Sequence, residues 1–149
     1  MKKVYISNNE AETAAVASKL AQITERGDIW ALSGTLGMGK SVFARAFIKA
    51  LSDADEVPSP TFTLVQIYRT PMFDIYHYDL YRLKEASEIF ELGVEEAFYE
   101  GVSLVEWPEK MGSFAPRNMW HIMIEAEGEK RKITISTEDE RKIGRLSNV

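Results

Sequence analysis

No cysteine occurs in this chain of 149 residues. Disulfide bonds and thiolate metal sites are therefore excluded, and with them the disulfide-stabilised domains of secreted proteins. The sequence also lacks an apolar run long enough to cross a membrane, and residues 1–7 contain no apolar stretch of signal-peptide length. Together these absences predict a cytoplasmic protein that does not contact a membrane.

Positive charge is scarce as well. The chain has 18 Lys and Arg against 23 Asp and Glu, which gives a formal net charge of −5. Proteins that bind nucleic acid by themselves usually carry a basic face, whereas the basic residues here are scattered. Direct nucleic-acid binding is therefore not expected. The length predicts a single domain over residues 1–149, with a charged tail or helix from about residue 138.

A glycine-rich segment is the most informative feature that is present. Residues 34–41 fit the phosphate-binding pattern G-x-x-x-x-G-K-[ST]. Glycine lets the backbone approach a phosphate closely, and successive N–H groups form a nest for anionic oxygens. Lys40 adds positive charge for the outer phosphates, and the Ser41 hydroxyl can ligate Mg²⁺. The candidate nucleotide-binding residues here are Gly34, Thr35, Leu36, Gly37, Met38, Gly39, Lys40, Ser41 and Val42.

The flanks of this segment have the periodicity of a strand and a helix. Residues 27–33 contain a short apolar run, and residues 42–51 place apolar side chains at helical spacing. Strand, loop and helix in this order aim a helix N-terminus at phosphate. Residues 61–68 and 73–78 are rich in β-formers and joined by a short turn, which predicts an antiparallel hairpin. The expected fold is α/β, a P-loop NTPase-type three-layer sandwich with a mixed parallel and antiparallel central sheet.

Capping residues and periodicity predict the remaining elements. A strand over residues 4–6 should precede a helix that ends near Gly27, with Ser7 and Glu10 as its capping box. The other predicted elements are a short helix over residues 85–92, a helical turn over 94–99, a central strand over 102–105, and two strands around 120–124 and 133–135.

Two acidic residues directly follow apolar strands. Asp79 comes after residues 73–78, and Glu106 comes after residues 102–105. A phosphate-binding loop needs a carboxylate near Mg²⁺ and a group that orients water, and the carboxyl ends of strands supply such groups in open α/β sheets. Sequence position leaves open which of the two acids faces the metal.

Several signatures of other nucleotide-binding classes are absent. The chain lacks the Asn-Lys-x-Asp element that reads guanine, an Asp-x-x-Gly after the loop, and the Leu-Ser-Gly-Gly of ABC proteins, so ATP is favoured. A small-molecule kinase remains an alternative, but only Arg82, and more remotely Arg117 and Arg131, hint at its basic lid. His77 lies in an aromatic-rich strand and is interpreted as a packed residue, and His121 alternates with Trp120 and is interpreted as a surface strand residue. Neither has a cysteine partner, so zinc is not expected.

Four ordered motifs resemble one family, the TsaE ATPases of tRNA threonylcarbamoyladenosine biosynthesis. After the phosphate loop come Ser-Pro-Thr-Phe-Thr-Leu-Val at residues 59–65 and His-Tyr-Asp-Leu-Tyr-Arg-Leu at residues 77–83. A Glu-Trp pair then ends an apolar strand at residues 106–107. The resemblance spans about residues 4–135 and is far more specific than the loop alone.

This resemblance implies a Mg²⁺-dependent ATPase that is weak alone and activated by partners. The family acts in bacteria with a threonylcarbamoyl-transferase subunit and its paralogous partner subunit, and it does not perform the transfer itself. tRNA would then be contacted only through that complex, which agrees with the acidic charge of this chain. A nucleotide-sensing interaction module, in which hydrolysis is incidental, is a further alternative.

The resemblance also implies roles for individual residues. Lys40 would contact phosphates, Ser41 and Glu106 would hold Mg²⁺, and Asp79 would position water or the switch-like loop. Lys40, Asp79 and Glu106 are accordingly the candidate catalytic residues.

Further positions follow from the same resemblance. Thr61 would sit in the nucleotide-sensing loop, and Trp107 would support Glu106 and the active site. The family has a Gly-Arg pair near its last hairpin that contacts nucleotide, and either Lys130 or Arg131 would take that role. Arg131 is the candidate nucleotide-binding residue of the two. Departures from the family pattern are Ser41 for the usual threonine, and Thr35 and Met38 for the common Asp and Ala.

Overall fold

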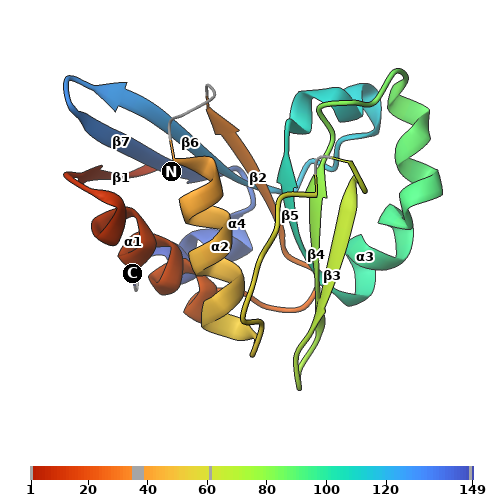
Figure 1. Ribbon diagram of the computed structural model, residues 1–149, viewed down its shortest axis with the longest axis horizontal. Helices are drawn as coiled ribbons and strands as arrows, with labels where there is room; N and C mark the ends of the chain where they lie inside the picture. Colours follow the sequence, from red (N-terminus) through yellow and green to blue (C-terminus); the bar gives the residue numbers. More distant parts are fainter. Residues whose placement is uncertain (1, 35–38, 61, 148) are drawn as a thin grey trace.

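The computed structural model describes residues 2–34, 39–60, 62–147 and 149 (Figure 1). Within these residues one sheet contains the strands β1 (Lys2–Ser7), β2 (Ile29–Gly34), β3 (Val65–Arg69), β4 (Asp74–Asp79), β5 (Val102–Glu106), β6 (Trp120–Glu127) and β7 (Lys130–Thr137). The helices are α1 (Glu10–Ile23), α2 (Lys40–Leu51), α3 (Val94–Glu100) and α4 (Glu140–Leu146), with 3₁₀ helices η1 (Ala86–Leu92) and η2 (Pro108–Phe114). In the described part of the chain, none of the helices is both long and apolar enough to cross a membrane.

The centre of the sheet is parallel and its two sides are antiparallel. The strand order is β1-β7-β6-β2-β5-β4-β3. β2 runs parallel to both β5 and β6, and β5 runs parallel to β4. β3 pairs antiparallel with β4, and β7 pairs antiparallel with both β6 and β1. The predictions of a mixed sheet, of a central strand over residues 102–105 and of a hairpin after the loop are therefore confirmed.

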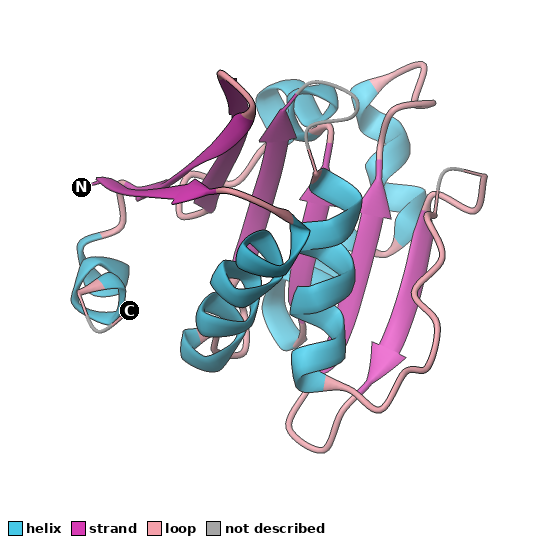
Figure 2. Ribbon diagram, turned by 60° about the vertical axis from the view of Figure 1, so that its left-hand side comes forward, coloured by secondary structure: helices cyan, strands magenta, loops and turns pink. Residues whose placement is uncertain are grey.

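Helices cover both faces of the sheet (Figure 2). α1 and α2 pack on one face, while α3 lies on the other with η1 and η2 (Figure 1). Alternate strand residues supply the two cores: Trp30 and Leu32 of β2 face α1 and α2, whereas Ile29 and Ala31 face the opposite layer. The expected three-layer α/β sandwich of the P-loop NTPase type is confirmed.

An aromatic cluster fixes β2, the strand that leads into the glycine-rich segment. The rings of Trp30 and Trp120 stack with centroids 4.6 Å apart, and Phe47 of α2 packs edge-on against Trp30 at 5.5 Å. The indole N–H of Trp30 donates a hydrogen bond to the Thr24 hydroxyl at 2.9 Å. β2 is thus held to β6 and α2 by packed rings, of which Trp30 also has its polar edge hydrogen-bonded.

The cap of α1 differs from the predicted one. Asn9, rather than Ser7, is the N-cap, and its side-chain oxygen accepts the backbone N–H of Glu12 at 2.9 Å. Ser7 is buried at the end of β1, where its hydroxyl shares a 2.7 Å hydrogen bond with the Thr13 hydroxyl. The predicted capping box of Ser7 and Glu10 is therefore wrong, because Ser7 still belongs to the strand.

β3 begins later than predicted. Leu64 adopts a left-handed conformation with φ 68°, its N–H donates to the Pro60 carbonyl, and its own carbonyl accepts the N–H of Asp79 at 3.0 Å. The turn at Leu64 delays the strand until Val65. η2 is an additional element that the sequence patterns did not predict.

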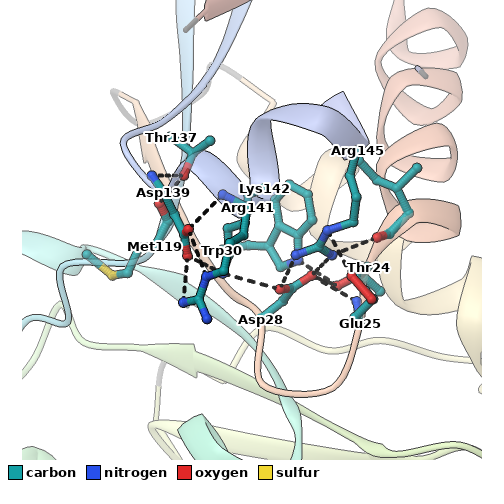
Figure 3. Close-up of polar contacts among 11 residues, drawn as sticks. Thr24, Glu25, Asp28, Trp30, Met119, Thr137, Asp139, Arg141, Lys142 and Arg145 are labelled. Atoms are coloured by element: carbon teal, nitrogen blue, oxygen red, sulfur yellow. Dashed lines mark hydrogen bonds and ion pairs between the residues drawn. The ribbon is translucent and has the colours of Figure 1, made fainter. Parts of the chain in front are cut away.

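The charged C-terminal segment, predicted as either a tail or a helix, forms the helix α4. Ion pairs hold this helix to the rest of the molecule (Figure 3). The Arg145 guanidinium contacts the buried Asp28 carboxylate at 2.7 and 3.0 Å and donates to the Ile23 carbonyl at 2.9 Å. Lys142 Nζ lies 3.7 Å from Asp28 and 3.2 Å from Asp139. Asp28 therefore joins α4 to the turn before β2.

Candidate nucleotide-binding site

Three parallel strands end at the same edge of the sheet, and each carries a predicted site residue there. β2 ends at Gly34, β4 at Asp79 and β5 at Glu106. The register pairs Glu106 with Leu32 on one side and with Asp79 on the other. Neighbouring strands lie about 4.8 Å apart, so Glu106 lies directly beside the strand that enters the glycine-rich segment, and Asp79 lies one strand further away.

The two described ends of the glycine-rich segment have backbones that favour glycine. Gly34 has φ +149°, and a Cβ there would lie 2.5 Å from the carbonyl oxygen of Ile124 on β6. Gly39 has φ +101° and is the N-cap of α2. Side chains would be strained at both positions. Predicted nucleotide-binding residues outside the described part are Thr35, Leu36, Gly37, Met38 and Thr61.

Lys40 is the first residue of α2 and is buried, with 6% of its surface exposed. Its ammonium lies over the Trp107 ring, 4.3 Å from the centroid. Among the residues that the structure describes, it has neither an ion-pair nor a hydrogen-bond partner. Lys40, Trp107 and Gly34 line a cleft of about 620 Å³. Because a buried cation without an anion is unfavourable, this cleft is suited to an anionic ligand.

Trp107 ends β5 abruptly. Its φ of 59° and ψ of 51° are left-handed, a conformation that costs of order 1–3 kcal/mol for a residue with a side chain. Besides the contact with Lys40, its ring lies 4.9 Å from that of Tyr81. Trp107 is half-buried rather than a core residue, and it lies beside Lys40.

Glu106 is buried and hydrogen-bonded to a histidine. His77 Nε2 lies 2.7 Å from Glu106 Oε2, and the histidine side chain is 3% exposed. His77 is buried as predicted, yet packing is not its whole role, because it also contacts a candidate metal ligand. Because His77 precedes Asp79 by two residues, both side chains lie on one face of β4. This spacing does not identify Glu106 as the partner of His77. His121 is exposed on β6, as predicted.

Asp79 shapes the chain on both sides of it. Its Oδ1 accepts the backbone N–H of Tyr81 at 3.1 Å, and its own N–H donates to the Leu64 carbonyl at 3.0 Å. Asp79 therefore caps the turn after β4 and ties Leu64 to the end of that strand.

Two predicted nucleotide contacts in the first turn of α2, Ser41 and Val42, have different surroundings. Ser41 is exposed, whereas Val42 lines a second cavity of about 160 Å³ together with Gly39 and Arg131. Lys130, the first residue of β7, is exposed and does not line that cavity. Of the two alternatives near the last hairpin, Arg131 is thus the one beside the start of α2.

The donor groups at this edge fit a metal that arrives with a nucleotide. Within the described residues, no group of three or more His, Asp or Glu side chains could hold a metal ion by itself. Mg²⁺ in nucleotide sites usually keeps several waters and takes one or two protein ligands together with phosphate oxygens. The exposed Ser41 hydroxyl and the Glu106 carboxylate match that requirement.

Comparisons with known proteins agree on one family. A sequence model of the family described as threonylcarbamoyl adenosine biosynthesis protein TsaE matches residues 7–134. Proteins named tRNA threonylcarbamoyladenosine biosynthesis protein TsaE from Rickettsia felis and Bacillus subtilis are 43% and 37% identical to this chain. These matches cover 87% and 86% of this chain, and 77% and 81% of the relatives. The crystal structure of Bacillus subtilis YdiB superposes with a TM-score of 0.84 at 29% identity, covering 99% of this chain and 93% of YdiB.

Proposed function

The chain belongs to the TsaE family and so to the machinery of tRNA threonylcarbamoyladenosine biosynthesis, and from this membership we propose that it is the ATP-binding and ATP-hydrolysing accessory subunit of that machinery. It acts on the threonylcarbamoyl-transferase subunit and its paralogous partner subunit, and it does not transfer the threonylcarbamoyl group itself. Its contact with tRNA runs through that complex, which is consistent with its net charge of −5.

One observation carries the ATP-binding part of this proposal. The buried Lys40 ammonium has no anionic partner within the described residues, and it lies at the N-terminus of α2. The same sheet edge carries two buried carboxylates, Glu106 and Asp79. A cation and a helix N-terminus favour phosphate, and nearby carboxylates favour the divalent metal that accompanies it.

Each of the proposed site residues has its own role in transferring the γ-phosphoryl group to water. Lys40 binds the outer phosphate oxygens and stabilises the negative charge that develops on them. Ser41 and Glu106 would hold Mg²⁺, which when bound supplies positive charge to the β- and γ-phosphate oxygens. Asp79 orients the attacking water through its carboxylate, and its backbone N–H holds Leu64 at the end of β4.

Two further contacts complete the proposed nucleotide site. Arg131 and Val42, which line the cavity beside Gly39, would contact the rest of the nucleotide. The indole of Trp107 covers the Lys40 ammonium and would have to release it when phosphate binds.

Calorimetric titration with ATP and GTP in the presence of Mg²⁺ tests the binding part of the proposal. ATP should bind, and GTP should bind at least about tenfold more weakly because the guanine-reading element is absent. Equal affinity for the two nucleotides would contradict the choice of ATP. Absence of any nucleotide binding would refute the proposal as a whole.

The fate of the γ-phosphoryl group separates an ATPase from a small-molecule kinase. Purified protein incubated with MgATP should release free phosphate without any added acceptor. Formation of ADP that requires an acceptor metabolite, with the phosphate found on that acceptor, would favour the kinase instead.

A further inference from the structure

His77 and Glu106 form a buried pair that the proposed ATPase mechanism does not yet use. Their facing atoms, Nε2 and Oε2, lie 2.7 Å apart, and the two side chains are 3% and 10% exposed. They come from the neighbouring parallel strands β4 and β5, where the register partner of Glu106 is Asp79. His77 lies two residues before Asp79 and on the same face of the sheet, so Glu106 reaches back along the sheet to meet it.

The hydrogen bond between the two side chains runs from His77 to Glu106. A carboxylate oxygen accepts, so Nε2 donates its N–H to Oε2 of Glu106. Nδ1, the second ring nitrogen, is buried and has no hydrogen-bond partner within the described part of the chain. The other carboxylate oxygen, Oε1, has no hydrogen-bond partner among the described residues.

The backbone around Glu106 is fixed as well. Its carbonyl accepts the N–H of Leu80 at 3.1 Å, and the left-handed Trp107 turns the chain away immediately afterwards. With the backbone and Oε2 both held, Oε1 can point in few directions. Hydrogen-bonded partners of this kind orient the ligands of metal sites, and their removal typically costs 10–100-fold in metal affinity.

We propose that His77 is a positioning residue that orients the Glu106 carboxylate toward the Mg²⁺ of bound MgATP. The inference rests on the proposed function, because it assumes that nucleotide and metal meet at this sheet edge. His77 itself touches neither the nucleotide nor the metal; it acts through Glu106.

Two conservative substitutions of His77 separate this role from simple packing. The amide nitrogen of His77→Gln reaches about as far as Nε2 and can still donate to Glu106, whereas that of His77→Asn is too short. Tyr68→Phe is the matched control, since it removes a buried hydroxyl on β3 that has no partner within the described residues. Each protein is titrated calorimetrically with a non-hydrolysable ATP analogue, once with Mg²⁺ and once with EDTA.

Wild-type protein and Tyr68→Phe should bind the analogue more tightly with Mg²⁺ than with EDTA. In His77→Asn the gain in affinity that Mg²⁺ brings should be about tenfold smaller than in the wild type, while the affinity in EDTA stays the same. His77→Gln should keep most of the wild-type gain. The inference is overturned if His77→Asn keeps the gain or if His77→Gln loses as much as His77→Asn. If thermal melting shows that His77→Asn is unfolded, the test depends on His77→Gln. A folded His77→Gln protein that has lost the Mg²⁺-dependent gain in affinity would then overturn the inference. A wild-type protein that does not bind the analogue at all would instead refute the proposed function.

Discussion

At the scale of single residues, the charge of Lys40 is the feature on which nucleotide binding depends most. Lys40→Ala should weaken ATP binding by about tenfold or more, because a hydrogen bond to a charged group contributes about 1.5–3 kcal/mol. Calorimetric titration with MgATP measures the loss. Lys49→Ala, an exposed lysine in the last turn of the same helix, is the control and should bind as the wild type does. Unchanged affinity in Lys40→Ala would remove this lysine from the site.

Gly34 is a second residue whose identity the structure explains. Gly34→Ala should lower the free energy of unfolding by about 3 kcal/mol, since its Cβ would lie 2.5 Å from a backbone oxygen of β6 and its φ is already +149°. Gly128→Ala is the matched control, because Gly128 has φ +62° but no atom within 4 Å of the added Cβ. It should cost only about 1–2 kcal/mol. Urea denaturation of both variants measures the difference, and equal losses would show that the clash is relieved.

At the scale of elements, α4 depends on Asp28 for its attachment (Figure 3). Asp28→Asn should lower the free energy of unfolding by about 3 kcal/mol, because it leaves the partly buried Arg145 and the buried Lys142 without their shared anion. Arg141→Ala is the control: the Arg141 side chain is 85% exposed, and loss of its ion pair with Asp139 should cost less than about 1 kcal/mol. Denaturant unfolding would contradict this if the two variants were equally destabilised.

The start of α4 should also respond to acid. Hydrogen bonds from the Arg141 side chain, with further contributions from its backbone N–H and Lys142, lower the pKa of Asp139 to about 2 from an ordinary value of 3.8. Because the folded pKa lies below the unfolded one, this stabilisation is present above pH 3.8 and is lost as the pH falls toward 2. Unfolding free energies measured across that range should therefore fall less steeply for Asp139→Asn than for the wild type. Identical slopes would show that Asp139 is not held in this way.

The elements also show what a sequence alone could predict. The compact apolar run of residues 102–105 predicted β5 and the acid at its end, Glu106, because buried parallel strands read as continuous apolar runs. The β-formers of residues 73–78 predicted β4 and its terminal acid, Asp79, although that strand also contains Asp74 and His77. The contact between His77 and Glu106 could not be predicted, since it joins residues 29 positions apart and depends on the register of two strands. The late start of β3 was missed for a similar reason: Leu64 is held in a turn by its hydrogen bond from Asp79, a tertiary contact.

At the scale of the whole molecule, the acidic charge bears on the proposed partners. The isolated protein should not bind tRNA measurably in a filter-binding assay at low salt, because its net charge of −5 repels the phosphate backbone. Retention of tRNA should appear only when the transferase subunits are added. Salt-sensitive tRNA binding by this protein alone would show a basic patch that acts independently of the complex.

The central claim is that ATP hydrolysis by this protein serves a partner complex. Phosphate release from MgATP, measured with purified protein alone and then with the threonylcarbamoyl-transferase subunit and its paralogous partner, tests that claim most directly. We expect slow release alone, a clear acceleration when both partners are present, and loss of the accelerated rate in Glu106→Ala. Rapid turnover that is indifferent to the partners, or an accelerated rate that survives Glu106→Ala, would contradict the account.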